Sequence, residues 1–524
     1  MNNDRLNTDS LPRLWLPLLG LLCVAYTWRP LQAMDDVWQH AATGRWIVET
    51  HQIPRHTLLL WTARINWTDH SWLTDVVSYA LLVCGGARVG PYVILGATCV
   101  AVTAIFVLIW RLWVERSRPT PLMPFLFALG IECSSYRFVP RPDLFTALGL
   151  TLLLAWLVQW SGPPPSQAPA SRERVSQATA SPRFWPIAIG IVILFAAWAN
   201  FHGAVAVGVG ILFASAMADI AQDRADHRSL GLLALAFLAL ASVCLTPYGW
   251  HYYSVWLIPK QLQFSLIDEW KPFWQSPRLG TDVVIEASLL TALAAVSWLL
   301  NPRRRWAHGL WLLLMAMAFL GARRYIWLLA IVCLVVMAAN SDSIDTRKWW
   351  NAIRPHPMPQ RWSTAMHGFI CVALLLMIAA SPFPWSLQPA AVSDDLPRGL
   401  VDFIAGRRIA GKVFNGDDYG SYLHWRFGDK LPLFIDDWNA FPDSLVIEYE
   451  NMLGYTPVGR QLLYGGGIDF VVLRAPVGSE TWPPLAVNLT ADRRWALVYQ
   501  GGDGAVWVRR IPRYEGIWKR EEIK

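Results

Sequence analysis

The chain has 524 residues, of which 54% are hydrophobic, 16% are charged and 31 are tryptophan. A composition this rich in hydrophobic residues and this poor in charge excludes an ordinary soluble protein of this length. The formal net charge of +7 is divided among short clusters between apolar runs, and no basic tail or aromatic-interleaved basic face indicates a nucleic-acid partner. All seven cysteines lie in or beside apolar runs, which excludes a disulfide framework and a CxxC metal site.

Eleven apolar runs approach the length of a membrane-spanning helix, which needs about 20 mostly apolar residues. They are residues 13–30, 91–113, 121–139, 143–160, 184–201, 203–220, 229–246, 282–300, 306–320, 323–340 and 363–380. Basic clusters between the runs are expected on the cytoplasmic side. These clusters are Arg111–Arg118, Arg172–Arg183, Arg224–Arg228, Arg303–Arg305 and Arg347–Arg361. The sequence therefore predicts a mostly α, multi-pass protein of the cell inner (plasma) membrane, with about 11 spans and a cytoplasmic N-terminus.

Two segments need separate interpretation. Trp72–Gly86 is apolar but short, and counting it as a span would move Arg111–Arg118 to the outer face. We therefore expect a helix that lies in the outer membrane interface. The Pro- and Ser-rich stretch Gly162–Pro182 is expected to be a low-complexity cytoplasmic linker.

The composition becomes that of a soluble domain near the end of the chain. We expect a membrane domain at residues 1–390, with a first outer loop at 31–90, and an extracytoplasmic α/β domain at 391–524. Its predicted helices are Leu396–Arg407, Tyr419–Phe427, Ser444–Leu453 and Pro457–Gly465. Its predicted strands are Lys412–Asn415, Leu433–Asp436, Phe470–Arg474, Trp495–Gln500 and Ala505–Arg509, the last two as a hairpin.

The stretch Met34–Asp75 is the most unusual part of the sequence, because carboxylates, histidines, arginines and tryptophans gather directly after the first apolar run. An ordinary outer loop with interfacial tryptophans would explain the aromatic residues. It would not explain the density of ionisable groups, which at a membrane surface are functional candidates.

Motifs in this stretch and beyond it resemble those of a known superfamily. They are Asp36, Trp38, His40, Gly44, Ile53-Pro54-Arg55, Trp67, His70, Trp72-Leu73, Asp75, Arg141-Pro142-Asp143-Leu144-Phe145, Trp198-Ala199-Asn200-Phe201-His202-Gly203, Pro247-Tyr248-Gly249, Glu269-Trp270 and Arg323-Arg324. Near the C-terminus, Val413-Phe414-Asn415, Gly420-Ser421-Tyr422-Leu423, Phe434-Ile435-Asp436 and Gly467-Ile468-Asp469 extend the match. The combination resembles the GT-C superfamily of bacterial, polyprenyl-phosphate-sugar-dependent membrane glycosyltransferases, of the mannosyltransferase and aminoarabinose-transferase type.

The resemblance implies an inverting glycosyltransferase that moves a sugar from a polyprenyl-phosphate donor to a cell-envelope acceptor, which is a glycan, a lipid or a protein. The reaction is expected on the outer face, with membrane lipid as a further partner. In this superfamily the essential acid lies in the first outer loop and a second acidic motif in the next. Asp36 and Asp143 occupy these two places. The first outer loop has no Asp-x-Asp or Asp-Glu pair, since Asp35-Asp36 is only a doublet, so the metal stays unassigned, with a divalent cation such as Mg²⁺ or Mn²⁺ as the candidate.

Asp36 is the candidate catalytic base for the acceptor. His40, four residues on, would share a helical face with it and is counted with the catalytic residues. The alternative for Asp36 is a helix N-cap, in which case Asp35 takes its place. Asp143 either assists catalysis at a metal or acceptor or caps the fourth span.

Phosphate binding suits arginine, whose planar fork pairs two oxygens and stays charged. Arg141, Arg323 and Arg324 lie at predicted outer ends of spans, against the usual bias of positive charge, although headgroup snorkelling would also place them there. His202 is expected to bind the sugar or phosphate, or else to satisfy a tight turn between spans. Three further residues complete the predicted substrate contacts: Asp35, His70 and Glu269.

Two other functions stay open. One is a non-catalytic sugar-binding or assembly scaffold, because a fold resemblance does not secure catalysis. The other, disfavoured, is a transporter, since only Glu132 and Glu286 are acidic residues clearly within spans and no repeat is visible. Metal binding by Asp417-Asp418 or Asp436-Asp437 is less favoured than a role in turns.

Overall fold

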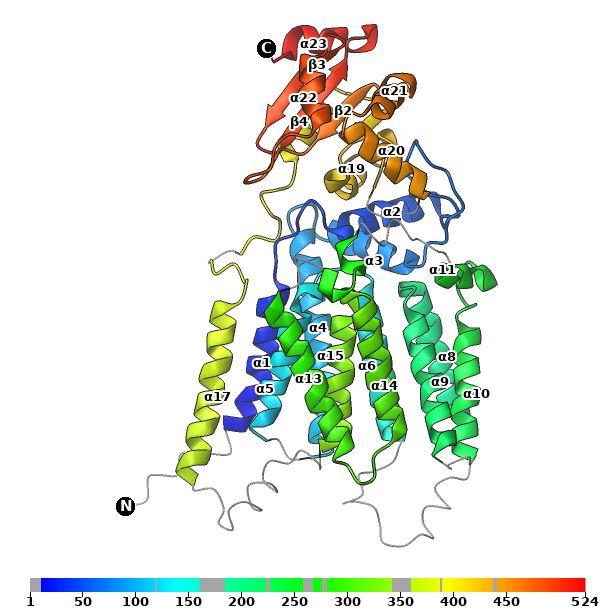
Figure 1. The fold of residues 1–524 in the computed structure, drawn as a ribbon, viewed down its shortest axis with the longest axis vertical. Coiled ribbons are helices and arrows are strands. Elements are labelled where there is room, and N and C mark those ends of the chain that lie inside the picture. Colours follow the sequence, from blue (N-terminus) through cyan, green and yellow to red (C-terminus); the bar gives the residue numbers. More distant parts are fainter. Residues whose placement is uncertain are drawn as a thin grey trace. The chain divides into compact units, whose positions relative to one another are not determined.

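The computed structural model describes residues 11–117, 120–160, 184–222, 227–257, 267–275, 280–341, 360–386, 389–436 and 441–523 (Figure 1). Its contacts divide the chain into two compact units. Unit 1 comprises Met1–Arg29, Leu95–Trp256 and Phe264–Leu387, and unit 2 comprises Pro30–Ile94, Leu257–Gln263 and Gln388–Lys524. The linker Gly162–Pro182 and Asp437 lie outside the described residues. So do most residues of the basic clusters Arg172–Arg183, Arg224–Arg228 and Arg347–Arg361.

Unit 1 is built from helices that coincide with all eleven apolar runs. They are α1 (Leu11–Thr27), α4 (Gly90–Val114), α5 (Leu122–Ser134), α6 (Asp143–Trp160), α8 (Phe184–Phe201), α9 (Val205–Ala221), α10 (His227–Ser242), α13 (Thr281–Leu299), α14 (Trp306–Gly321), α15 (Ile326–Ala339) and α17 (Gln360–Ala380). A short helix, α11 (Ser254–Leu257), follows α10.

The expected number of spans is not reached. Among the described residues, four helices are long and apolar enough to cross a membrane, namely α4, α6, α8 and α13, instead of about 11. The apolar runs include residues that do not continue the helix. The run 121–139, for example, ends as a helix at Ser134 and continues as a 3-10 turn at Ser135–Arg137. Likewise α15 begins only after a 3-10 turn at Arg323–Tyr325.

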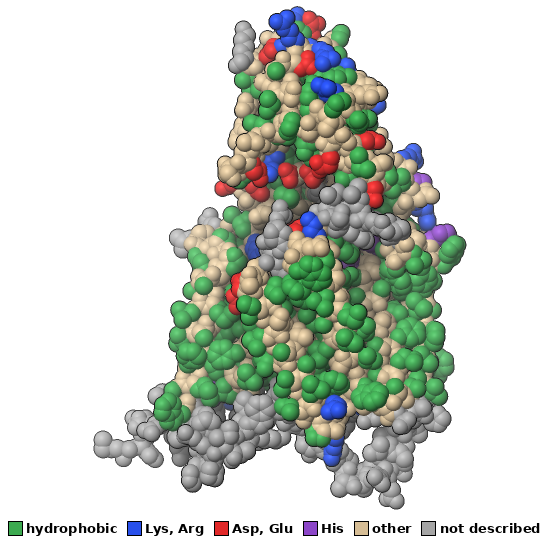
Figure 2. Space-filling model, viewed as in Figure 1, with side chains coloured by type: hydrophobic (Ala, Val, Ile, Leu, Met, Phe, Trp, Pro, Cys, Tyr) green, Lys and Arg blue, Asp and Glu red, His purple; other side chains and the backbone are tan. Residues whose placement is uncertain are grey.

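The core of unit 1 forms around α15, which packs against α5, α6, α13 and α14. Nearly every residue of α15 is buried, as expected for a helix that is apolar on all sides. Hydrophobic side chains instead cover the outward faces of α13, α14 and α17 in Figure 2. Leu289, Leu313 and Phe369 on these helices are exposed. These outward apolar faces are typical of helices that contact lipid.

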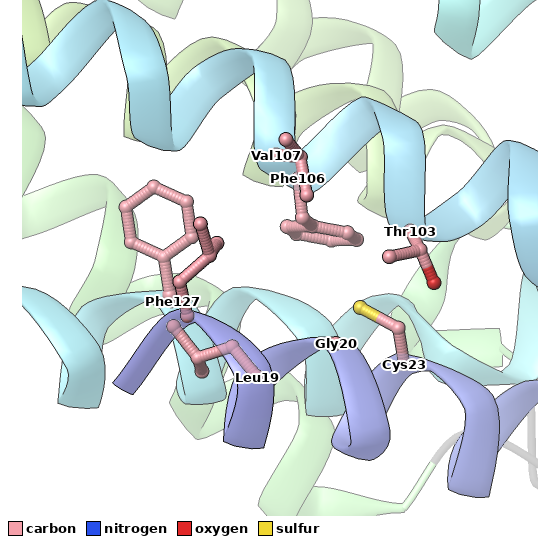
Figure 3. A pocket seen from close by; sticks show the side chains of 8 residues that line it. Leu19, Gly20, Cys23, Thr103, Phe106, Val107 and Phe127 are labelled. Atoms are coloured by element: carbon pink, nitrogen blue, oxygen red, sulfur yellow. The ribbon is translucent and has the colours of Figure 1, made fainter. Parts of the chain in front are cut away.

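A small apolar pocket lies among α1, α4 and α5. Figure 3 shows residues from all three helices around it. The residues that line it are Leu16, Leu19, Gly20, Cys23, Thr103, Phe106, Val107 and Phe127. None of these lining residues is among the predicted site residues.

Unit 2 combines two helices of the first loop with the C-terminal α/β region. Its helices are α2 (Asp36–Thr50), α3 (Trp72–Val83), α18 (Arg398–Gly406), α19 (Gly420–Phe427), α20 (Asp443–Leu453), α21 (Pro457–Gly465), α22 (Pro484–Ala491) and α23 (Glu515–Glu521). Its strands are β1 (Val413–Asn415), β2 (Phe470–Leu473), β3 (Trp495–Gly501) and β4 (Gly504–Arg509). They form one sheet in the order β1-β2-β4-β3, with β1 parallel to β2 and the other pairs antiparallel.

The sequence-based elements of unit 2 are largely confirmed, including the short helix at Trp72–Val83 and the final hairpin. The strand expected at Leu433–Asp436 is wrong. Leu433 instead forms an isolated parallel bridge with Leu60 of the first loop, so the segment has no sheet neighbour that would extend it. Helices α22 and α23 were not expected.

The first loop contributes to the hydrophobic core of the C-terminal region. Leu60, Trp61 and Ala63 pack against a cluster that includes Phe414 and Phe434. The Trp61 indole also donates a hydrogen bond to the carbonyl of Val413 at 2.9 Å. The domain boundary predicted at residue 390 stays a prediction. Residues 30–94, which the sequence analysis assigned to the membrane domain, make their contacts mainly with the C-terminal region.

Candidate functional site

A cluster of arginines and carboxylates lies in unit 1, where the connections between helices meet. Glu269 is its centre. One carboxylate oxygen, Oε2, accepts hydrogen bonds from Arg137 and, at 2.9 Å, from Arg141, while Oε1 lies 3.3 Å from Nη1 of Arg324. Three guanidinium groups, two from the connection between α5 and α6 and one from the connection between α14 and α15, therefore converge on one carboxylate.

Asp143 and Arg137 form a second ion pair within this cluster. Asp143 is the first residue of α6, and its Oδ2 accepts hydrogen bonds from Nε of Arg137 at 2.9 Å and from Nη2. The Arg137 side chain is 2% exposed, so this guanidinium has exchanged water for the two carboxylates of Asp143 and Glu269. A buried charge of this kind is tolerated only when it is paired.

The 3-10 turn Asp268–Trp270 supplies further contacts to the cluster. Asp268 pairs with Arg323 at 3.2 Å, and the Trp270 ring lies 4.1 Å from the Arg324 guanidinium. Arg323 also donates its backbone N–H to the carbonyl of Lys271. The turn is thus fixed to both arginines at the start of α15.

The electrostatics of the cluster favour the charged forms of Glu269 and Arg137. Burial opposes the charge of Glu269, but the neighbouring arginines outweigh it and hold the pKa of that carboxyl well below its ordinary range. Burial likewise opposes the charge of Arg137, but Asp143 and Glu269 raise the pKa of the guanidinium well above its ordinary value. Among the ion pairs of the described residues, four guanidinium groups face three carboxylates here, an excess of one positive charge. The cluster is therefore suited to binding an anion.

His202 is connected to the same end of α6. Its Nδ1 lies 2.7 Å from the hydroxyl of Thr146, one turn after Asp143, and the Trp198 indole donates to that hydroxyl at 2.9 Å. His202 is buried, and these bonds fix its ring against α6. This arrangement agrees with the expected role in a tight turn and leaves a substrate role as a prediction.

A second cluster lies in unit 2, between α2 and α3. His40 Nδ1 lies 2.6 Å from Oδ1 of Asp75, and both side chains are buried. Asp69 is fully buried beside them and accepts a hydrogen bond from the backbone N–H of Ser71 at 3.0 Å. Burial raises the pKa of Asp69 well above its ordinary range, with a further rise from Asp75, and burial also raises the pKa of Asp75. Two buried carboxyl groups side by side keep a proton at a pH at which isolated carboxyl groups would be ionised.

Asp35 and Asp36 stand at the beginning of α2. Asp36 is the first helical residue and is half-buried, so it is not the N-cap. Asp35 occupies the cap position, where its carboxylate accepts a hydrogen bond from the backbone N–H of Gln32 at 2.7 Å instead of capping the helix. Asp36 and His40 are four residues apart on α2, as the sequence predicted. His70 lies between Asp69 and the start of α3 and is half-buried.

Helix α2 also contacts the C-terminal region through buried polar groups. The Gln39 amide donates to Oδ2 of Asp436 at 3.3 Å, and His424 Nε2 lies 3.3 Å from the same oxygen. Arg45 donates to the carbonyl of His424 and lies over the Trp425 ring. These contacts fix the orientation of the helix that carries Asp36.

Comparisons with solved structures show which fold this chain shares. No family model and no curated protein matches the sequence. Oligosaccharyltransferase AglB of Archaeoglobus fulgidus, solved with an inhibitory peptide and a dolichol-phosphate, matches with a TM-score of 0.60 and 12% identity, over 95% of this chain and 74% of that one. Arabinofuranosyltransferase AftD from Mycobacteria matches with a TM-score of 0.55 and 12% identity, over 95% of this chain and 41% of that one. Both are GT-C glycosyltransferases. This chain has the GT-C fold.

At such low identity the likeness shows the fold alone. A further AglB structure, solved with Zn and sulfate, has a TM-score of 0.59 at 11% identity, over 94% of this chain and 73% of that one. In this chain, the described residues include no group of three His, Cys, Asp or Glu side chains that could hold a metal ion.

Unit 1 of this chain unites five of the predicted site residues: Arg141, Asp143, Glu269, Arg323 and Arg324. Sequence reasoning missed Arg137, although an arginine inside the apolar run 121–139 was a signal. It also missed Asp268, whose neighbour Glu269 was named. In unit 2 it missed Asp69 and the pairing of Asp75 with His40, because these depend on how α2 packs against α3.

Proposed function

We propose that this chain is an inverting glycosyltransferase that transfers a sugar from a polyprenyl-phosphate donor to a cell-envelope glycan, lipid or protein on the outer face of the membrane. The observation that carries the proposal is the cluster of four arginines with an excess positive charge, in a chain with the GT-C fold. AglB was solved with a dolichol-phosphate, which is a lipid phosphate of the proposed donor class.

The proposed task of unit 1 is to bind the donor phosphate. Arg141, Arg323 and Arg324 would take up the charge that develops on the phosphate as the sugar leaves, and Arg137 is added to this set. The cluster has the required chemistry, since guanidinium groups pair with phosphate oxygens in a fixed planar geometry. Asp143 would hold Arg137 in place and remains a candidate for acceptor contact.

The proposed task of unit 2 is proton transfer. As the acceptor nucleophile attacks the anomeric carbon, Asp36 would take its proton and the bond from that carbon to the phosphate oxygen would break. The polyprenyl phosphate leaves with the bonding electron pair. His40, held by Asp75, would assist Asp36, with Asp35 as the alternative base. His202 and His70 are proposed to contact sugar hydroxyls.

The test is donor turnover by the purified chain in lipid nanodiscs, with a panel of polyprenyl-phosphate sugars and release of polyprenyl phosphate as the readout. Asp36→Asn and Arg141→Gln should each lower turnover at least about 100-fold, in the range of lost catalytic groups. Glu49→Gln, at an exposed position on α2, and Arg303→Gln, at an exposed turn, are matched controls that should retain activity. Full turnover by Asp36→Asn would remove Asp36 as the base, and full turnover by Arg141→Gln would remove Arg141 as a donor contact.

A further inference from the structure

Glu269 occupies the position in the cluster where an anion would bind best. Its two carboxylate oxygens accept from or pair with Arg137, Arg141 and Arg324. Arg137 and Arg141 lie in the connection between α5 and α6, and Arg324 lies in the 3-10 turn before α15. A phosphate group offers oxygens to the same guanidinium nitrogens. The carboxylate and a bound phosphate would therefore compete for the same donors.

We propose that Glu269 is a resident counter-anion of the arginine cluster, and that the donor phosphate displaces it when it binds. This inference rests on the proposed function and adds its regulation: without donor, Glu269 keeps the arginines paired, and binding of the donor releases the segment 267–275 that carries it. The class of ligand is a lipid-linked phosphate.

The charges around Glu269 make this exchange feasible. Arg137 keeps its hydrogen bonds to Asp143 when Glu269 leaves, so this most buried guanidinium is never left unpaired. Arg141 and Arg324 gain the phosphate in place of the carboxylate. Glu269 itself is 22% exposed, whereas the Arg137 side chain is 2% exposed, so the carboxylate has access to water when it moves away.

The short turn that carries Glu269 also contacts the two arginines that precede α15. Asp268 pairs with Arg323, Trp270 lies over Arg324, and Lys271 accepts one backbone hydrogen bond from Arg323. All of these contacts involve the two arginines at the start of α15. A phosphate that recruits Arg324 would therefore weaken the attachment of the turn at the same time as it replaces Glu269.

The first experiment measures binding of undecaprenyl phosphate to the full chain in detergent, for the wild type, Glu269→Gln, Arg141→Gln and Asp282→Asn. Glu269→Gln should bind on the order of tenfold more tightly than the wild type, because the competing charge is gone. Asp282→Asn removes a negative charge from the exposed first turn of α13 and should bind like the wild type. Arg141→Gln should bind at least about tenfold more weakly.

The outcomes separate this inference from the proposed function. If Arg141→Gln weakens binding but Glu269→Gln does not strengthen it, the displacement of Glu269 is overturned and the phosphate site remains supported. Binding that neither substitution changes overturns both. A thermal unfolding scan of each variant shows whether it is folded under the assay conditions.

Hydrogen–deuterium exchange provides a second test that does not depend on a variant. Amides of residues 267–275 should exchange faster in the wild type when undecaprenyl phosphate is bound, because the turn has lost Glu269 as an anchor. In Glu269→Gln the faster exchange should be present without the lipid. Slower or unchanged exchange in the wild type with bound lipid would show that Glu269 stays with the arginines and would overturn the inference.

Discussion

Gly44 of α2 lies directly against the backbone of α3 at Asp75. A Cβ atom at position 44 would fall 2.0 Å from the carbonyl oxygen of Asp75, closer than any real contact. This approach brings the two helices near enough for His40 and Asp75 to meet at 2.6 Å. The glycine thus determines the geometry of the buried His40–Asp75 pair.

Gly44→Ala should therefore separate α2 from α3. Because backbone atoms cannot move aside as a flexible side chain would, we expect a loss of about 1–3 kcal/mol in the free energy of unfolding. Denaturation of the purified chain, followed by circular dichroism, measures it. Gly465→Ala is the matched control, since a Cβ there meets no atom within 4 Å. Equal stability of the two variants would contradict the close approach.

Asp69→Asn should change how stability depends on pH. The pKa of Asp69 is raised by burial, so above its ordinary value of 3.8 the folded chain keeps a proton that the unfolded chain releases. Wild-type stability should fall as pH rises from 3.8 toward the folded-state pKa. An amide cannot ionise, so the variant should show a shallower fall in melting temperature between pH 4 and 7. Asp402→Asn, at an exposed carboxylate, should keep the wild-type slope, and an unchanged slope in Asp69→Asn would refute the shift.

Arg137→Gln should destabilise unit 1 strongly. The substitution leaves Asp143 and Glu269 without the guanidinium that both contact, and loss of one partner from a buried ion pair costs about 3–5 kcal/mol. Thermal unfolding in detergent provides the measurement. The comparison is Arg494→Gln, whose side chain is 60% exposed beside Asp492 and whose loss should cost less than about 1 kcal/mol. Similar effects of the two substitutions would mean that Arg137 is solvated.

Trp61→Ala should weaken the core of the C-terminal α/β region, although Trp61 belongs to the first loop. The variant loses the hydrogen bond to Val413, the edge contact with the Phe434 ring and the position of Lys412 over the indole. We expect a loss of about 2–4 kcal/mol for this partly buried side chain. Limited proteolysis should then cut the C-terminal region sooner than in Trp185→Ala, where the side chain is 73% exposed. Cleavage at the wild-type rate would count against a shared core.

The local elements could be predicted because apolar runs and their periodicity decide them. Every predicted span contains a helix. The sequence predicted Arg141, Arg323 and Arg324 as site residues because positive charge at the outer ends of spans is unusual. The sequence could not show that Arg137 meets Glu269, 132 positions later, since only packing brings such residues together. The same limit explains the error at Leu433–Asp436. That segment has the composition of a strand, but its neighbour is Leu60, and an isolated bridge does not make a sheet.

The shared core of unit 2 has a consequence for biosynthesis. Pro30–Ile94 is synthesised before residues 95–387, whereas its partner Gln388–Lys524 follows them. At about 5–20 residues per second, the early segment waits roughly 15–60 s before the first of its partner residues is made. During this delay the Trp61 indole lacks Val413 and Phe434, so the nascent chain presents an apolar surface that a chaperone or the lipid headgroup layer must cover until the C-terminal region emerges.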